Sequence, residues 1–107
     1  MFNLGTNSGA SCDHRLRETI GAVLAASRQR SIVDGRFKGG WITRAFGRPS
    51  EGVEAVQLEL ACRAYMQEPE RPAPDNWPTL IDETRAAPTR ATIKRVLEAI
   101  LSVVSGS

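Results

Sequence analysis

Apolar residues recur along this chain with two periods, one typical of helices and one typical of a strand. The helical period occurs in residues 13–28 and again in residues 89–104. The stripe of the first segment is Leu16, Ile20, Val23, Leu24 and Ser27. The stripe of the second segment is Ile93, Val96, Leu97, Ile100, Leu101 and Val104. Each predicted helix therefore has one apolar face, which indicates packing against a sheet or another helix.

Residues 53–60 alternate between apolar and polar positions instead, which predicts a half-buried strand. One face becomes apolar toward its end, while the other begins with Val53 and Ala55 and ends in Gln57 and Glu59. A carboxylate at the end of such a strand, in a sheet covered by helices, suits ligand binding. Partial burial there would raise the pKa of Glu59, as a general base requires. The alternative, that Glu59 only reaches solvent at a sheet edge, stays open.

Turn-forming residues decide the predictions for the rest of the chain. Residues 1–12 are rich in Gly, Asn, Ser and Thr and predict a loop. Residues 31–34 predict a short strand that ends at a glycine. Residues 67–78 contain four prolines and predict a semi-extended surface connector. Residues 79–87 predict a short helix that Pro88 would break or kink. Strands that alternate with helices indicate the α/β class.

A basic, glycine-rich loop follows the short strand. Its cations are Arg36, Lys38, Arg44 and Arg48, with no acidic residue between Asp34 and Glu51. Guanidinium groups and backbone N–H groups beside Gly39 and Gly40 suit a carboxylate or a phosphate. A solvated basic loop in which the glycines make a turn is the alternative. The apolar residues predicted to anchor the far side of this loop are Trp41, Ile42 and Phe46.

Composition limits the classes of partner. The chain has 107 residues, a formal net charge of +2 and 24% charged residues, which predicts one domain without a nucleic-acid or membrane partner. No apolar run is long enough to cross a bilayer and no signal peptide is recognisable. Cys12 and Cys62 are predicted to be free thiols in a cytoplasmic protein. These cysteines and the single His14 match no zinc-ligand spacing, so no metal site is predicted.

Three ordered stretches carry a family resemblance: FNLGTNSGASC at 2–12, DGRFKGGWITRAFGRP at 34–49 and EGVEAVQLELACRAYM at 51–66. They resemble the C-terminal portion of the N-formylglutamate amidohydrolases, also called N-formylglutamate deformylases. The resemblance implies the C-terminal part of a three-layer, zinc-carboxypeptidase-like (phosphorylase/hydrolase-like) α/β fold. Two or more strands and two main helices are expected, with residues 1–107 forming a single partial domain.

The resemblance also implies roles for particular residues. Glu59 resembles the carboxylate that activates the zinc-bound water and shuttles its proton. Arg36 resembles a residue that holds the substrate carboxylates or polarises the formyl oxygen. Other substrate-binding residues implied in the same pocket are Lys38, Gly39, Gly40 and Arg44. Asp34 stands where many members of the family carry Asn, and a carboxylate only accepts hydrogen bonds.

Zinc is the cofactor of the family, whose metal ligands lie in upstream segments. This chain is therefore not expected to hold zinc alone and is expected to be inactive alone. The implied function is hydrolysis of N-formyl-L-glutamate to formate and glutamate, in histidine breakdown. The alternatives are a non-catalytic module that binds dicarboxylates and a module that associates with itself or with a complementary polypeptide through an unpaired strand edge.

Overall fold

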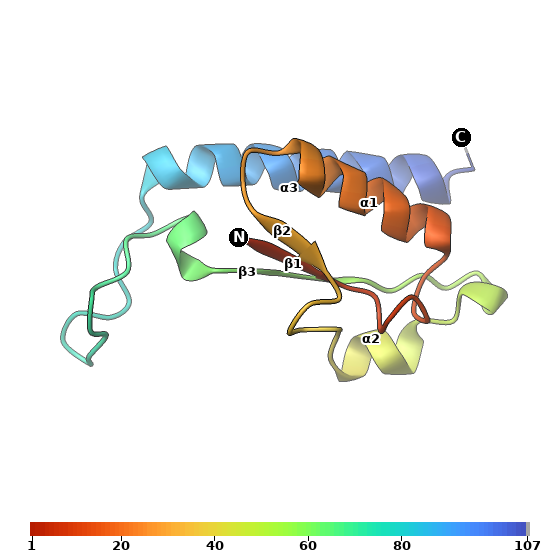
Figure 1. Ribbon diagram of the computed structural model, residues 1–107, viewed down its shortest axis with the longest axis horizontal. Helices are drawn as coiled ribbons and strands as arrows, with labels where there is room; N and C mark the ends of the chain where they lie inside the picture. The colour runs from red at the N-terminus through yellow and green to blue at the C-terminus, as the bar shows by residue number, and fades with distance from the viewer. Residues whose placement is uncertain (107) are drawn as a thin grey trace.

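The computed structural model describes residues 1–106 and places two helices against one face of a three-stranded sheet (Figure 1). The strand order is β2-β1-β3, with β1 parallel to β2 and antiparallel to β3. The elements, including two short 3-10 helices labelled η, are β1 Phe2–Gly5, α1 His14–Ala26, β2 Ser31–Val33, α2 Trp41–Phe46, η1 Pro49–Glu51, β3 Gln57–Leu60, η2 Cys62–Ala64 and α3 Glu83–Val104. The predicted α/β class, with two or more strands and two main helices, is confirmed.

The central strand lies in the segment that composition predicts to be a loop, so that prediction is wrong for residues 2–5. All four residues of β1 are buried, because the strand has a neighbour on each side and helices on one face. Phe2 and Leu4 alternate with Asn3 and are fully buried in the core. Because β1 pairs with a strand on each side, it is buried, although the surrounding Gly, Asn and Ser residues suggest a solvent-exposed loop.

The register of the strands separates two faces of the sheet. Phe2 pairs with Leu60, and Leu4 pairs with Leu58, so these side chains share the face that packs against α1 and α3. The opposite face, here called the site face, carries Asn3, Ile32, Gln57 and Glu59. The predicted alternation of residues 57–60 is therefore confirmed.

The strand predicted over residues 53–60 is shorter in the structure and begins at Gln57. Val53 instead forms an isolated bridge with Arg48 across the turn that η1 makes. The backbone N–H of Ala55 donates to Ser11 at 3.0 Å, outside the sheet. Val53 and Ala55 thus bond to segments outside the sheet.

Helix α1 agrees with the predicted segment to within two residues at each end. Asp13 caps it, with its side chain accepting a hydrogen bond from the backbone N–H of Arg15. The buried residues of α1 are Leu16, Ile20 and Leu24, which are three members of the predicted stripe. They form the core with Phe2, Leu4 and Val96, and removal of any of these side chains would leave a cavity.

Helix α3 runs without a break through Pro88, so the first of the two predicted alternatives, a break at this residue, is wrong. The helix begins earlier because the Asp82 side chain accepts hydrogen bonds from the backbone N–H groups of Thr84 and Arg85. Thr89 is buried and donates to the carbonyl oxygen of Ala64 at 2.7 Å. These tertiary contacts offset the hydrogen bond that a proline inside a helix cannot make.

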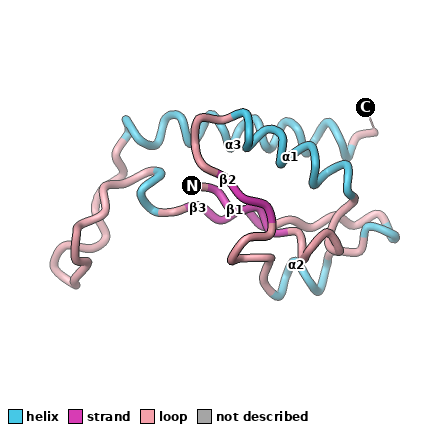
Figure 2. The backbone as a smooth tube through the Cα atoms, viewed as in Figure 1, coloured by secondary structure: helices cyan, strands magenta, loops and turns pink. Residues whose placement is uncertain are grey.

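The apolar stripe of α3 is only partly buried. Val96 lies in the core, and Ile93, Ile100 and Val103 pack against it. The other predicted members, Leu97, Leu101 and Val104, are more than half exposed, so the stripe is wider than the contact with α1 and the sheet. The predicted connector is confirmed: Figure 2 shows the segment between η2 and α3 as a long loop that extends away from the sheet.

The basic loop contains a short helix, α2, which the sequence did not predict. Its buried residue is Thr43, whereas Trp41 and Ile42 are 67% and 69% exposed. Trp41 meets Phe46 edge-on, with ring centroids 5.7 Å apart. The prediction that Trp41, Ile42 and Phe46 anchor the loop is therefore wrong, because α2 turns its polar Thr43 inward.

Both cysteines are free thiols, as predicted. Burial, followed by the charges of Glu54 and Asp34, raises the pKa of Cys12 to about 11. A thiol with this pKa stays protonated at neutral pH and is a poor nucleophile. Among residues 1–106, no helix combines the length and the hydropathy that a membrane span requires.

Candidate functional site

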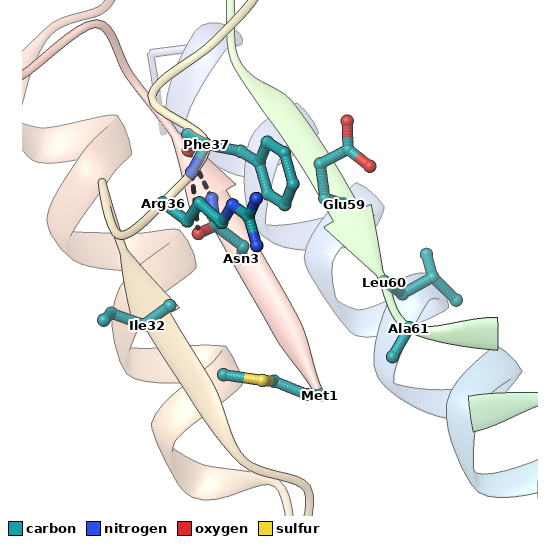
Figure 3. Close-up of a pocket in the computed structure, with 8 residues that line it drawn as sticks. All are labelled: Met1, Asn3, Ile32, Arg36, Phe37, Glu59, Leu60 and Ala61. Carbon is teal, nitrogen blue, oxygen red and sulfur yellow. Dashed lines mark hydrogen bonds between the residues drawn. The ribbon is translucent and has the colours of Figure 1, made fainter. Parts of the chain in front are cut away.

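The site face carries a cavity of about 420 Å³ (Figure 3). Its mouth and walls are formed by Met1, Asn3, Ile32, Arg36, Phe37, Glu59, Leu60 and Ala61. Most of these groups are apolar, and Arg36 and Glu59 supply one positive and one negative side chain. A mostly apolar cavity with a few convergent polar groups is the usual form of a small-molecule site.

Arg36 and Glu59 reach this cavity from different parts of the chain. Arg36 follows the turn after β2, and its guanidinium carbon lies 5.7 Å from the centroid of the Phe37 ring. Glu59 lies on β3 beside Asn3 of β1. Figure 3 shows both side chains on one side of the sheet, with the Phe37 ring between them in that view. Both are exposed, so the partial burial expected for Glu59 is not provided by residues 1–106.

The segment that carries Arg36 is held against β1 by a buried amide. Asn3 donates from Nδ2 to the carbonyl oxygen of Phe37 at 2.5 Å and accepts from its backbone N–H at 3.4 Å. The backbone N–H of Asn7 donates to the carbonyl oxygen of Lys38 at 2.6 Å. Because the Asn3 side chain and the Asn7 backbone both bind the loop, the loop has a fixed position over the site face.

The close approach of the loop to the sheet requires a glycine at Gly5. A Cβ atom at this position would lie 2.8 Å from the backbone of both Lys38 and Gly39. Gly39 itself has a φ of 118°, a conformation that other residues rarely adopt. Gly5 therefore permits the close approach of the loop to β1, and Gly39 permits the backbone conformation of the loop.

A second side chain connects the loop to Glu59. Gln57 accepts a hydrogen bond at Oε1 from the backbone N–H of Gly40 at 2.7 Å. Its Nε2 donates to Oε1 of Glu59 at 2.9 Å. The carboxylate predicted to be catalytic is therefore linked through one amide to the basic loop.

The other predicted substrate-binding residues lie in the same loop but do not line the cavity. Lys38 and Arg44 are exposed, and Arg44 donates from Nη1 to the carbonyl oxygen of Gly39 at 3.0 Å. The N–H of Gly40 is bound to Gln57. The structure thus brings together Arg36 and Glu59, whereas the roles of Lys38, Gly39, Gly40 and Arg44 stay predictions.

Asp34 lies in a different environment from the cavity. Its carboxylate, with 8% of the side chain exposed, accepts hydrogen bonds from the backbone N–H and the hydroxyl of Thr6, at 2.7 and 2.5 Å. Arg17 of α1 approaches it at 3.3 Å. Burial alone would raise the pKa of Asp34, but the hydrogen bonds from Thr6, Ser8 and Arg17 outweigh it and lower the pKa. Asp34 thus connects β1, α1 and β2, and its carboxylate acts in the structure as a hydrogen-bond acceptor.

The described residues, 1–106, do not fit a zinc site. Among residues 1–106, no three His, Cys, Asp or Glu side chains are grouped closely enough to hold a metal ion. His14 is 78% exposed and lies 3.5 Å from Asp13. A catalytic zinc requires three protein ligands and an open position, and these side chains do not supply them.

The sequence pattern alone does not single out two polar residues of the site face, Asn3 and Gln57. Asn3 was hidden in a segment predicted to be a loop. Its signal is the alternation of Phe2 and Leu4 around one polar residue, which is short but strand-like. Gln57 shares the predicted polar face with Glu59, and the residue two positions away on a strand points to the same side.

Comparisons with known proteins show which family this chain resembles. A family model described as N-formylglutamate amidohydrolase matches residues 1–66. Over 102 residues, the chain is 47% identical to an N-formylglutamate deformylase of Pseudomonas aeruginosa and 45% identical to one of Pseudomonas putida. Each match covers 94% of this chain and 36% of the relative, so the chain spans about a third of the relatives' length.

A solved structure extends the likeness to the fold. The crystal structure of an N-formylglutamate amidohydrolase from Ralstonia eutropha JMP134 superposes with a TM-score of 0.77 at 24% sequence identity. The match covers 99% of this chain and 35% of that chain. From the family match and the relatives at 45–47% identity, the chain belongs to the N-formylglutamate amidohydrolase family.

Proposed function

We propose that this chain supplies the carboxylate and a substrate-binding cation for hydrolysis of N-formyl-L-glutamate to formate and glutamate. The proposal is carried by one observation, that Arg36 and Glu59 line the same cavity on the site face. Their roles come from the family, whose relatives in Pseudomonas are named N-formylglutamate deformylases. In the same proposal, the α/β unit is the C-terminal part of a three-layer, zinc-carboxypeptidase-like fold of a cytoplasmic enzyme of histidine breakdown.

The chemistry assigned to Glu59 is general base and then general acid catalysis. Its carboxylate takes a proton from the water whose oxygen attacks the formyl carbon. When the C–N bond breaks, the same proton goes to the leaving nitrogen of glutamate. One oxygen, Oε1, is occupied by Gln57, so Oε2 is the oxygen assigned to this transfer.

Arg36 has a positioning role in this proposal. N-formyl-L-glutamate has two carboxylates at neutral pH, and a guanidinium binds a carboxylate through two parallel hydrogen bonds. Lys38 and Arg44 lie in the same loop and add positive potential, which favours the approach of a dianion. The apolar wall that Ile32 and Ala61 contribute suits the methylene groups of the substrate.

Substitution of Arg36 tests the binding part of this proposal. We expect N-formyl-L-glutamate to bind the isolated chain with a dissociation constant of about 1 mM or tighter. Arg36→Ala should weaken binding about 10- to 100-fold, because a charge-assisted hydrogen bond is lost. Isothermal titration calorimetry measures both values. Arg48→Ala is the matched control, since Arg48 pairs with Glu51 at 3.0 Å, away from the cavity; equal losses in both variants would contradict the proposal.

The isolated chain is expected to hold no zinc tightly and to release no formate. The reason is that its described residues bring no three metal ligands together. Metal analysis and a formate-release assay on one purified sample measure both quantities. Bound zinc at one ion per chain together with turnover would contradict this expectation and would require a ligand set that residues 1–106 do not form.

A second candidate function is a non-catalytic module that binds dicarboxylates, or one that associates with itself or with a complementary polypeptide. The observation that favours it is the position of β2 and β3, which are the two outer strands of the described sheet. Outer strands present backbone groups that can pair with another strand. A dimer on size-exclusion chromatography would favour self-association, whereas binding of N-formyl-L-glutamate without formate release is expected for both candidate functions. A compact monomer would count against self-association.

A further inference from the structure

We propose that Gln57 is a positioning residue that fixes the Glu59 carboxylate relative to the basic loop. The inference rests on the proposed function of Glu59 and adds a residue to which the family comparison assigns no role here. Gln57 is not among the residues that line the cavity. It acts on the site only through its two neighbours, Gly40 and Glu59.

The two hydrogen bonds fix the orientation of the Gln57 amide. The backbone N–H of Gly40 is a donor, so the Gln57 atom that faces it, at 2.7 Å, must be the carbonyl oxygen Oε1. The amide nitrogen Nε2 then has to point toward Glu59, which accepts at Oε1 over 2.9 Å. Rotation of the amide by 180° would place two donors together and two acceptors together, so a single orientation is stable.

This orientation gives the two carboxylate oxygens of Glu59 different environments. Oε1 is bound to Gln57, and the bond restricts the rotation of an otherwise exposed side chain. Oε2 is left to meet the reacting water. General base catalysis depends on holding the base within hydrogen-bond distance of the proton it takes, so a fixed carboxylate increases the rate of that step.

The same amide links Glu59 to the loop that carries Arg36. Gly40 ends the loop segment that begins near Arg36, and Asn3 holds the middle of this segment at Phe37. Gly40 also precedes α2 as its N-cap residue. Gln57 from β3 and Asn3 from β1 therefore hold the same loop at two points. Loss of Gln57 should release Glu59 while Asn3 still holds Arg36.

Other side chains at position 57 would not perform both functions. A glutamate could accept from Gly40, but its carboxylate would repel Glu59. A methionine has similar length and no donor. Only an amide of this length both accepts from the loop and donates to the carboxylate. At position 57, Gln57→Ala therefore removes both hydrogen bonds, whereas Gln57→Glu keeps only the bond from Gly40.

Nuclear magnetic resonance of the ¹⁵N-labelled chain tests the bonds directly. In the unmodified chain we expect the Gln57 side-chain amide to have one downfield proton signal, bound to Glu59. Glu59→Ala should return that signal to the position of a free amide, while exchange of the Gly40 amide proton stays slow. Gln57→Ala should speed exchange of the Gly40 proton about threefold to tenfold, as expected for one lost hydrogen bond. Gln57→Glu should keep the Gly40 proton protected.

Ligand binding separates this inference from the proposed function. Gln57→Ala should leave the affinity for N-formyl-L-glutamate within about twofold, since Arg36 and the cavity are unchanged. In any preparation that contains this chain and releases formate, Gln57→Ala should lower kcat about threefold to tenfold, with KM unchanged. Gln29→Ala is the control, because Gln29 binds Thr89 at 2.7 Å, away from the site face.

The possible outcomes distinguish two failures. If N-formyl-L-glutamate does not bind the unmodified chain, the proposed function fails, whatever the Gln57 signals show. If the ligand binds but Glu59→Ala leaves the Gln57 side-chain signal in place, the bond between Gln57 and Glu59 does not exist and this inference is overturned. An equal fall in affinity for Gln57→Ala and Arg36→Ala would also overturn it, since Gln57 would then bind the ligand.

Discussion

Asp34→Ala is expected to lower the free energy of unfolding by about 3 kcal/mol. The Asp34 carboxylate accepts two hydrogen bonds from Thr6, which has no exposed surface, and contacts Arg17 at 3.3 Å. Its removal leaves a buried N–H and a buried hydroxyl without their acceptor, and each such group costs about 1–3 kcal/mol. Asp34 also has a φ of 50°, where alanine is strained. Urea denaturation measures the change in free energy.

The contribution of Asp34 should depend on pH in one direction. Hydrogen bonds hold the pKa of the folded Asp34 carboxylate below its ordinary value of 3.8, which applies to the unfolded chain. The stabilisation is therefore fully present above 3.8 and is lost as the pH falls from there through the folded pKa. The difference between the unmodified chain and Asp34→Asn should shrink over this acidic range.

Asp34→Asn is the matched variant for this prediction. Asparagine tolerates the positive φ and can accept one hydrogen bond, so we expect a loss of about 1–2 kcal/mol at neutral pH. A constant difference from neutral pH to pH 3 would contradict the role given to the carboxylate charge. Equal stability of all three proteins would contradict the contacts themselves.

Gly5→Ala is expected to lower the free energy of unfolding by about 1–3 kcal/mol, the usual cost of an added methyl group in a packed region. The added Cβ would lie 2.8 Å from backbone atoms of Lys38 and Gly39, which cannot rotate away as a side chain could. The loop must therefore move outward and carry Arg36 with it. We expect weaker binding of N-formyl-L-glutamate in addition to the loss of stability.

The control for Gly5→Ala is another glycine in a regular element. Gly21 lies in α1, and a Cβ there would meet only a methyl group of Val33 at 3.6 Å, an ordinary contact. Gly21→Ala should leave stability unchanged or raise it by up to about 1 kcal/mol, because alanine favours the helix. Calorimetric melting of both variants measures the contrast. A Gly5→Ala chain as stable as Gly21→Ala would show that the loop does not lie against β1.

The elements that the sequence predicted correctly are those in which the apolar residues of one segment face a single neighbouring surface. The stripe of Leu16, Ile20 and Leu24 packs on one side, and the alternation of Leu58 and Glu59 separates two faces of one sheet. Both periods follow from local geometry, since a helix repeats every 3.6 residues and a strand every two. Glu59 was found for the same reason.

The elements that were missed depend on contacts distant in sequence. The short strand β1 has only Phe2 and Leu4 as apolar signals, and its burial comes from β2 and β3. Pro88 is accommodated because Asp82 begins the helix upstream of it. The exposure of Trp41 could not be predicted. An apolar side chain tends to be buried, but the sequence does not show which residues, if any, would cover it.

The same distinction holds for the candidate site. Arg36 and Glu59 could be named through the family resemblance, and the polar character of position 57 was visible in the strand pattern. The hydrogen bonds that connect Gly40, Gln57 and Glu59 were not predictable. They depend on a loop that passes so close to β1 that only a glycine fits at position 5. The position of the loop over β1 follows from the chain topology, and the spacing of apolar residues along the sequence does not indicate it.

The cavity on the site face is tested most directly by titrating the ¹⁵N-labelled chain with N-formyl-L-glutamate and mapping the amide signals that move. The predicted result is a saturable change at Arg36, Phe37, Glu59 and Ala61, which line the cavity, and its loss in Arg36→Ala. The contradictory result is a change confined to another surface, such as the groove between α1 and α3 beside Arg28 and Arg95, or no change at millimolar ligand.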